Sequence, residues 1–547
     1  MKKFNYISLA FLSLMFLGAC EQEVMTLTQP EPDMTNLGPD PCAGGAGTAN
    51  FTKFVAIGNS FVAGVQGGAL FNDGQANSLP AIINKQLACA GGTATFNQPN
   101  INATLGWNLF VTQPFLSDNT KPVLGRLRLQ GTPPRPTPQA YAAGVLEAVP
   151  NPAANPGFIY TGGKATLNNF GIPAIVLGQS LIEETGDWTV AGVDPRFSPF
   201  YGRLAPPPGG TTTLIGDAAA AGGSFFLFWL GLDDFFLHAA FGGDPSLAPL
   251  TNAVGGTQFD FDFQYTAAIT TLLGSNAELK GVVGNFPDIF KMPHFTSVAY
   301  NAVPLDAATA AQLNGGFAGY NAALDGLKNP AFGGAFGTAE QLDARKITFA
   351  TGNNRPVLID ETLQDLGAGF DALLGAGAIT PEQRAALEPY EQVRQTSSTD
   401  ILPLSTGSVL GTTVGGNPLL INGLTVPLAD RYVLIPTEIT AINNARVAYN
   451  SIVTGIVASN TTKLALADVD AALNALITAQ AGIYNGVTIT PNINPPTGIY
   501  SEDGVHPNTR GYAFLANVFI DAINAKFGST IPKANLARYS ATGLPLP

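Results

Sequence analysis

The feature that most constrains the fold of this chain is the apolar run at residues 224–230, SFFLFWL, which has no polar side chain after its serine. A strand with one face in water alternates polar and apolar side chains, whereas a strand covered on both faces does not. The run stops at Gly231, and glycine is typical of turns. We therefore expect a central strand of a parallel sheet with helices on both faces.

Other segments predict the same arrangement. Short apolar segments predict further strands at residues 51–57, 281–286 and 463–467. Helices are predicted at residues 79–87 and 468–477 and, most clearly, between the capping residue Asn508 and Gly528. The last of these carries one apolar stripe: Tyr512, Leu515, Phe519, Ile523 and Phe527. Strands that alternate with helices indicate an α/β fold with a parallel sheet.

The composition limits the classes of partner. Only 12% of the 547 residues are charged, while 62 are Gly and 41 are Pro, which favours long ordered loops over helical bundles. The net charge is −13, and the sequence contains neither basic clusters nor basic helices. Nucleic acid and an anionic membrane surface are therefore excluded as expected partners.

The N-terminus predicts export and lipidation. Lys2 and Lys3 precede an apolar stretch at residues 6–17, which is too short to span a bilayer and is typical of an export signal. Its ending, Leu17-Gly18-Ala19-Cys20, resembles the lipobox of bacterial lipoproteins, in which the cysteine carries the lipid. The alternative is an ordinary secretory signal in which Cys20 is incidental.

We expect a signal peptide at residues 1–20, a flexible tether at 21–49 and a single domain at 50–547. Two long segments at about 90–165 and 300–425 are interpreted as insertions that cover the active site, the alternative being a separate central domain. With Cys20 assigned to lipid, Cys42 and Cys89 remain as one possible disulfide or as two free thiols.

Two motifs near opposite ends of the domain supply groups for nucleophilic catalysis. Ser60 follows the first predicted strand, and Asp503 precedes His506 by three residues just before the last helix. A serine hydroxyl becomes a good nucleophile when an imidazole takes its proton, and a carboxylate orients that imidazole. The chain has only 3 histidines, and the other two, His238 and His294, lack partners at metal-ligand spacing and are expected to be structural.

Four short blocks resemble, in order, those of the SGNH hydrolases of the GDSL lipase/esterase superfamily, in the lipoprotein form of Bacteroidetes-like bacteria. The blocks are Gly58-Asn59-Ser60, Asn169-Phe170-Gly171-Ile172-Pro173-Ala174, Gly231-Leu232-Asp233-Asp234 and Asp503-Gly504-Val505-His506-Pro507-Asn508. Three positions depart from the family pattern: Asn59 stands for an aspartate, Ala174 for the oxyanion glycine and Asp233 for the oxyanion asparagine.

The resemblance implies a flavodoxin-like three-layer α/β/α sandwich in which Ser60 is the nucleophile, His506 the general base and Asp503 its orienting partner. The oxyanion would be bound by the backbone N–H groups of Ser60 and Ala174 and at the position of Asp233. An ionised Asp233 cannot donate a hydrogen bond. Three possibilities stay open: Asp233 is protonated, it points away, or the protein no longer needs an oxyanion hole. We expect Asp233→Asn to raise kcat/KM near neutral pH by about tenfold or more, roughly 1.4 kcal/mol.

The sequence thus predicts a lipid-anchored serine esterase or lipase of the cell envelope, expected in the outer membrane, that hydrolyses acyl esters or lipids. It predicts no metal, no cofactor and no membrane contact besides the N-terminal anchor. The alternatives are a catalytically impaired binding lipoprotein on the same fold, an acyl transferase, and a carbohydrate O-deacetylase.

Overall fold

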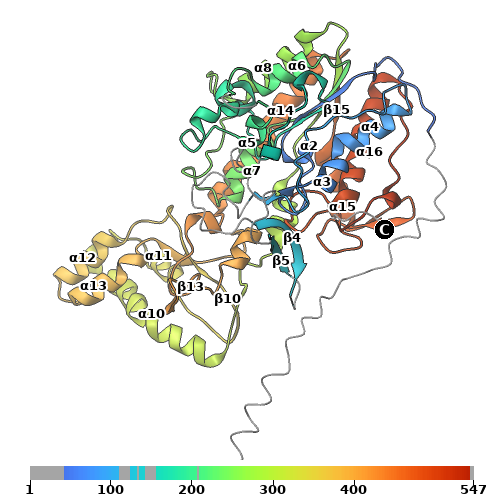
Figure 1. Cartoon of the computed structure of the whole chain (residues 1–547). Coiled ribbons are helices and arrows are strands. Elements are labelled where there is room, and N and C mark those ends of the chain that lie inside the picture. The colour runs from blue at the N-terminus through green and yellow to red at the C-terminus, as the bar shows by residue number, and fades with distance from the viewer. Residues whose placement is uncertain (1–41, 110–123, 132–134, 142–155, 206–208, 543–547) are drawn as a thin grey trace, which may run out of the picture.

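The computed structural model describes residues 42–109, 124–131, 135–141, 156–205 and 209–542 (Figure 1). A five-stranded sheet, in which every neighbouring pair is parallel, forms its centre. In spatial order, its strands are β15 (Leu464–Ala467), β8 (Lys280–Gly284), β7 (Phe225–Trp229), β1 (Phe54–Gly58) and β6 (Asn169–Gly171). The main helices around it are α4 (Leu79–Ala88), α6 (Leu214–Ala220), α7 (Asp233–Ala240), α8 (Phe261–Ser275), α14 (Pro436–Ser459), α15 (Val469–Ala479) and α16 (Thr509–Phe527).

Numbered along the chain, the five strands lie in the order 2-1-3-4-5. This is one of the two common orders of doubly wound α/β sheets, and such sheets bind ligands at the carboxyl ends of the strands where the order reverses. Here the order reverses between β1 and β7, whose last residues, Gly58 and Trp229, pair with each other. The fold therefore directs attention to the segments that follow these two strands.

The two faces of β7 are packed against different helices. Trp229 contacts Phe519 of α16 with a ring-centroid distance of 5.6 Å, and Phe228 contacts Tyr265 of α8 at 5.1 Å. Because neighbouring residues of a strand point to opposite faces, α16 and α8 cover opposite sides of the sheet. This double coverage explains the uninterrupted apolar run and is compatible with a three-layer α/β arrangement.

The strands and helices predicted from apolar pattern are confirmed. Asn508 caps α16, its side chain accepting a hydrogen bond from the Gly511 N–H, and Gly528 ends the helix with a φ of 65°. The apolar pattern did not predict the short strand β6 or the helices α6, α7, α8 and α14. The three residues of β6 carry no alternation to detect, and α14 has a weakly patterned surface because only Ile442, Tyr449 and Val453 are buried.

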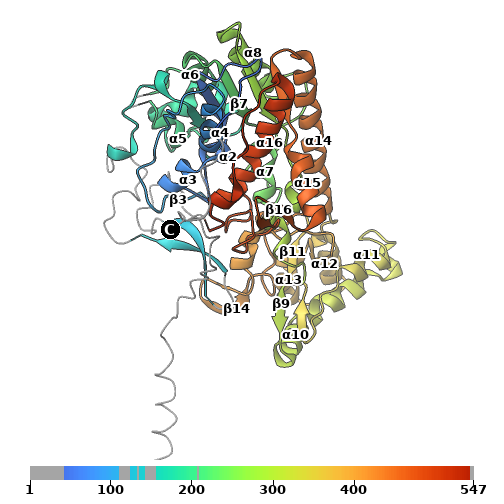
Figure 2. The same cartoon turned by 90° about the vertical axis from the view of Figure 1, so that its right-hand side faces the viewer.

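The second insertion forms a lobe with its own apolar core (Figures 1 and 2). It lies in the crossover between β8 and β15 and follows the short helix α9 (Pro293–Thr296). Its helices are α10 (Ala307–Leu327), α11 (Ala339–Ala344), α12 (Gly367–Gly375) and α13 (Pro381–Leu387). Its strands are β9 (Val303–Leu305), β10 (Gly352–Asn354), β11 (Val357–Ile359), β12 (Val393–Gln395), β13 (Thr413–Val414) and β14 (Asn417–Ile421). The segment expected to be loop cover is thus a packed lobe, because residues spread over about 120 positions share one core.

The described part of the first insertion contains a hairpin of β4 (Leu124–Gln130) and β5 (Arg135–Ala140). The Leu127 N–H donates to the Gly67 carbonyl at 2.7 Å, and Arg128 lies 3.9 Å from the carboxylate of Glu502. Two further antiparallel pairs are formed by β2 (Ala69–Leu70) with β3 (Trp107–Asn108) and by β16 (Gly482–Tyr484) with β17 (Val487–Ile489). The insertion therefore borders the segment that carries Asp503.

The segment expected to be a tether is already fixed to the domain from residue 42 onward. The Thr48 N–H donates to the Phe527 carbonyl at 2.8 Å, and the Gly45 N–H donates to Thr530 Oγ1 at 2.8 Å. The expected boundary at residue 49 is therefore wrong, because the end of α16 offers acceptors to this segment. The signal peptide and Cys20 lie outside the described residues. Within the described residues, no helix combines the length and apolar character that crossing a membrane requires.

Cys42 and Cys89 form a disulfide that closes a loop with a sequence separation of 47 residues. Cross-linking a loop of this size removes unfolded-state entropy worth about 2–4 kcal/mol. We expect Cys42→Ser/Cys89→Ser to lower the free energy of unfolding by about that amount, measured by urea denaturation. Equal stability of the variant and the non-reduced parent would contradict this contribution.

Candidate active site

Ser60 begins a short helix directly after β1. The helix α2 (Ser60–Ala63) is capped by Asn59, whose side chain accepts from the Phe61 N–H at 3.2 Å. At Gly58, a Cβ atom would lie 2.5 Å from the Trp229 carbonyl oxygen, so the close approach of β1 to β7 requires glycine. These constraints place Ser60 at the carboxyl end of β1, at the reversal point of the sheet.

The hydroxyl of Ser60 faces a backbone donor from another segment. The Ala174 N–H donates to Ser60 Oγ at 2.9 Å, although Ser60 itself is only 4% exposed. Ala174 follows β6 and has a φ of 54°, in the left-handed region where a Cβ atom is strained. As the first residue of a helix, Ser60 also has an N–H without an intrahelical acceptor. Both N–H groups therefore lie close to the Ser60 hydroxyl.

Asp503 and His506 meet in a buried hydrogen bond. His506 Nδ1 lies 2.8 Å from Asp503 Oδ2. In the neutral imidazole this contact assigns the proton to Nδ1, which leaves Nε2 as the acceptor. The pair therefore has the orientation that a general base requires.

The carboxylate of Asp503 is saturated with donors. Besides His506 Nδ1, it accepts from the N–H groups of Val505 and His506 at 2.8 Å each and from the Gly68 N–H at 2.5 Å. Burial by itself raises the pKa of Asp503, but the charge of His506 and these hydrogen bonds outweigh burial and hold that pKa below its ordinary value. Asp503 is therefore ionised at neutral pH.

The two motifs, more than 400 residues apart, share one site. The ring of His506 packs against Phe61, the residue after Ser60, with a centroid distance of 5.1 Å. The Gly67 N–H donates to Ser501 Oγ at 2.8 Å, beside the Gly68–Asp503 bond. The segment after α2 thus holds the loop that carries His506 next to Ser60.

Asp233 lies at the start of α7, directly after the turn that follows β7. Burial, and then the neighbouring Asp234, raise the pKa of Asp233 to about 8, while the Asn59 side chain opposes the rise. Burial raises the pKa of Asp234 to about 7 despite a hydrogen bond of 2.8 Å from the Leu177 N–H. At neutral pH Asp233 is therefore mostly protonated.

Two buried polar atoms at this site have no hydrogen-bond partner within 3.5 Å among the described residues: Asn59 Nδ2 and Asp233 Oδ2. Their residues are close enough for Asn59 to affect the pKa of Asp233, and Asn59 adjoins Ser60. Buried polar groups are rarely left unpaired except at sites that bind or transform a ligand. A protonated Asp233 and the Asn59 amide are both able to donate to an incoming oxygen.

The remaining histidines have backbone partners. His238 Nδ1 lies 2.7 Å from the Ala248 carbonyl oxygen, in agreement with a structural role. His294 of α9 contacts the site: its Nδ1 lies 3.0 Å from the Asp503 carbonyl oxygen, and its N–H donates to Gly504 at 2.9 Å. Burial lowers the pKa of His294 and keeps it neutral. No local signal in the sequence could have placed it there, because it lies 209 positions from Asp503.

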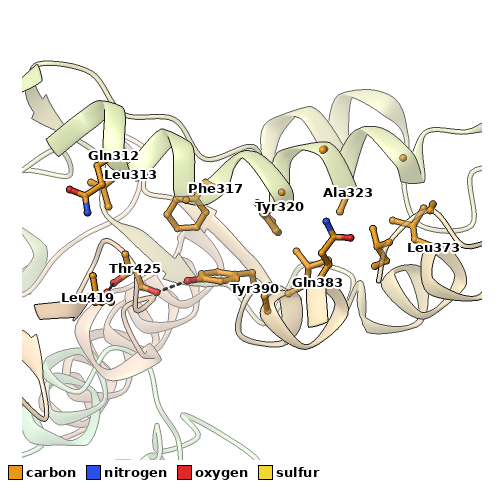
Figure 3. Close-up of a pocket in the computed structure, with 18 residues that line it drawn as sticks. Gln312, Leu313, Phe317, Tyr320, Ala323, Leu373, Gln383, Tyr390, Leu419 and Thr425 are labelled. Carbon is orange, nitrogen blue, oxygen red and sulfur yellow. Dashed lines mark hydrogen bonds between the residues drawn. The ribbon is translucent and has the colours of Figure 1, made fainter. Parts of the chain in front are cut away.

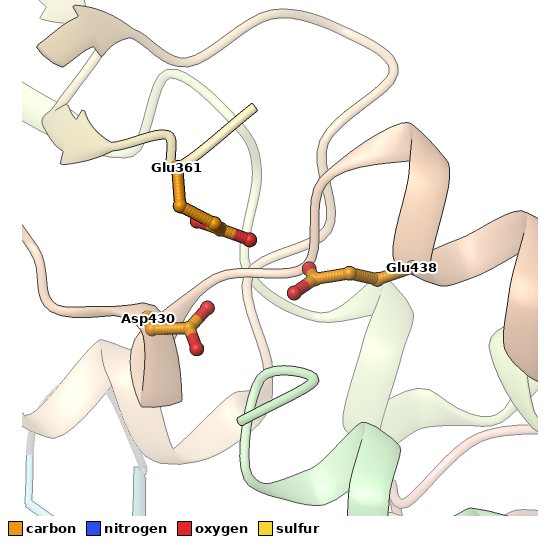
Figure 4. Close-up of side chains that lie close together, drawn as sticks. All are labelled: Glu361, Asp430 and Glu438. Carbon is orange, nitrogen blue, oxygen red and sulfur yellow. The ribbon is translucent and has the colours of Figure 1, made fainter. Parts of the chain in front are cut away.

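Within the described residues, one group of acidic side chains has a geometry that could hold a metal ion. Oxygens of Glu361, Asp430 and Glu438 lie within 4.8 Å of one another, where the lobe meets α14 (Figure 4). Burial, and then neighbouring carboxylates, raise the pKa of Asp430 to about 6; burial raises that of Glu438 to about 8. Protonation of Glu438 at neutral pH therefore reduces the repulsion within the group, which contains none of the residues that surround Ser60.

Comparisons of the chain with protein-family models, with curated proteins and with solved structures found no match.

The left-handed conformation of Ala174 leads to a prediction. Ala174→Gly keeps the N–H but removes the strained Cβ, so we expect the free energy of unfolding to rise by about 0.5–1 kcal/mol while activity is retained. The measurement is urea denaturation of both proteins. Ala525→Gly, on the exposed face of α16, is the control and should instead lower stability. A loss of stability in Ala174→Gly would show that Cβ packing outweighs the strain.

Proposed function

We propose that this protein is a serine esterase or lipase of the SGNH type, with Ser60, His506 and Asp503 as its catalytic triad. The observation that carries the proposal is the convergence of a backbone N–H on Ser60 Oγ with a carboxylate-oriented imidazole beside the same helix. The order of strands, 2-1-3-4-5, agrees with the flavodoxin-like sheet expected of such a hydrolase.

The chemistry follows from these positions. His506 Nε2 takes the proton of the Ser60 hydroxyl as Oγ bonds to the ester carbonyl carbon. The N–H groups of Ser60 and Ala174 stabilise the resulting oxyanion. His506 then gives its proton to the departing alcohol oxygen, and the C–O bond of the ester breaks. Water, deprotonated by His506, releases the acid and restores Ser60.

Asp233 contributes to this scheme in its protonated form. With a pKa of about 8, its carboxyl group is a hydrogen-bond donor at neutral pH, as the asparagine of the family would be. We therefore expect Asp233→Asn to raise kcat/KM relative to the parent at alkaline pH rather than near neutral pH. A neutral acid held by burial beside an oxyanion is a known catalytic device.

The N-terminal sequence supports an envelope location with lipid on Cys20, so the proposed substrates are acyl esters or lipids outside the cytoplasm. The second candidate is a binding lipoprotein on the same fold. The strained Ala174 and the buried Asp233–Asp234 pair favour it, because both depart from an optimised oxyanion hole. A fluorophosphonate probe separates the two candidates, since only an activated serine reacts quickly.

We expect Ser60→Ala and His506→Ala each to reduce kcat for a short-chain nitrophenyl ester by at least about a thousandfold. The double variant should be hardly slower, because residues that act as one unit lose most of their effect with the first deletion. Ser246→Ala, in an exposed turn, is the matched control and should leave the rate unchanged. Retention of most activity by Ser60→Ala, once contaminating esterases are excluded, would refute the triad.

The pKa of Asp233 predicts a pH dependence. Below about pH 8 the neutral carboxyl group donates to the oxyanion, and above it the carboxylate repels the oxyanion. We expect kcat/KM of the parent to fall about tenfold between pH 7 and pH 9, whereas Asp233→Asn keeps its rate over that range. The measurement is a pH–rate profile of both proteins on one ester.

The control for this profile is Asp521→Asn, which removes a carboxylate that is 55% exposed and should follow the parent curve. Background hydrolysis at alkaline pH is subtracted with Ser60→Ala. Parallel profiles for the parent and Asp233→Asn would show that Asp233 does not face the oxyanion.

A further inference from the structure

A groove with a volume of about 580 Å³ lies in the lobe, between α10, α12 and α13 and the hairpin of β13 and β14 (Figure 3). Its lining includes none of the residues assigned to the triad or to the oxyanion. The volume lies within the range of small-molecule sites in proteins, which are mostly apolar with a few polar groups. The groove is therefore a separate candidate binding site.

The lining indicates an uncharged, apolar occupant. None of the lining residues that the structure describes carries a formal charge, and polar side chains come only from Gln312, Tyr320, Gln383, Tyr390 and Thr425. The Tyr390 hydroxyl already donates to the Thr425 carbonyl at 2.6 Å. A phosphate would lose its hydration here without gaining a cationic partner, and such a loss is costly.

The groove is elongated along α10. Its lining follows α10 from Gln312 to Gly326, and at a rise of about 1.5 Å per residue this stretch measures about 20 Å. Figure 3 shows Gln312 and Leu419 at one end and Leu373 at the other. An apolar space that runs along about four turns of one helix suits an extended alkyl chain.

Glycines of α10 leave this space open. A Cβ atom at Gly316 or Gly319 would meet nothing within 4 Å, so neither glycine serves close packing. In the middle of a helix each glycine costs about 1 kcal/mol relative to alanine. The rings of Phe317 and Tyr390 pack together at 5.3 Å and those of Tyr320 and Tyr390 at 5.8 Å, so the three side chains form one continuous aromatic surface that lines the groove.

Exposed apolar side chains continue the groove at one end. Leu419 lines it yet is 67% exposed, and its neighbours Leu420 and Val414 on the same hairpin are also exposed. Clustered exposed apolar side chains commonly mark a site of interaction with apolar partners. This end provides an entry for an apolar chain whose polar end stays in water.

We propose that the groove of the lobe binds the alkyl chain of one long-chain fatty acid, with its carboxylate in solvent. Such a site goes beyond the proposed hydrolysis and does not depend on it, because the groove contains none of the residues assigned to the reaction. Fatty acid is also the class of product that an esterase acting on lipids would release.

The experiment measures binding to the full chain carrying Ser60→Ala, so that turnover plays no part. The probe is cis-parinaric acid, a fluorescent long-chain fatty acid, displaced by palmitate or by butyrate. Gly319→Leu fills the open space with a residue that favours helix, and Gly316→Leu is a second variant. Gly455→Leu is the matched control, because Gly455 lies on α14 and its Cβ would also meet nothing within 4 Å.

We expect saturable binding that palmitate displaces and butyrate does not. Gly319→Leu and Gly316→Leu should each weaken it at least tenfold, and Gly455→Leu should change it less than twofold. As a second readout, palmitate should raise the melting temperature of the full chain carrying Ser60→Ala alone, and butyrate should not. Absence of saturable binding, equal displacement by butyrate, or unchanged affinity in both groove variants would overturn the proposal. The proposed function is tested separately: Gly319→Leu is made in the protein that retains Ser60, and its hydrolysis of a short ester is measured.

Discussion

The buried carboxylate of Asp503 is the constraint on which the candidate site depends. A buried ionised group is tolerated only when its oxygens are saturated, and here the donors come from Gly68, Val505 and His506. One carboxylate thereby fixes the segment after α2, the turn of its own loop and the imidazole orientation. His294 adds a contact to the Asp503 carbonyl from α9, so a third part of the chain is held at the same point.

The sheet explains why these parts meet. In the strand order 2-1-3-4-5, connections diverge at the reversal point, and the segments that follow the two strands face a common crevice. Ser60 follows β1 and Asp233 follows β7, so the topology itself brings the proposed nucleophile and the proposed oxyanion position to the same edge of the sheet. Burial in this crevice raises the pKa of Asp233. A protonated aspartate is able to donate a hydrogen bond, so the residue fits the proposed role of a donor.

The lobe adds a second structural unit to the central domain. It is inserted where β8 would otherwise cross directly to β15, has its own core and contains the long apolar groove. The chain therefore combines a polar candidate active site with a separate apolar groove. Gly316 and Gly319 of α10 keep the groove open because they place no side chain in it, although glycine makes the helix less stable.

The sequence by itself determined the elements whose signals are local: the doubly covered strand at Phe225–Trp229, the capped helix Thr509–Phe527, and the Asp503–His506 pair on one turn. The residue type alone showed that Asp233, when ionised, cannot donate a hydrogen bond to an oxyanion. Only the tertiary structure decided its protonation, because burial and Asn59 come from other segments. It also decided the contact of Ala174 with Ser60, the position of His294 and the separate apolar core of the lobe. Each of these depends on residues far apart in the chain, whose proximity is set by packing and carries no local pattern.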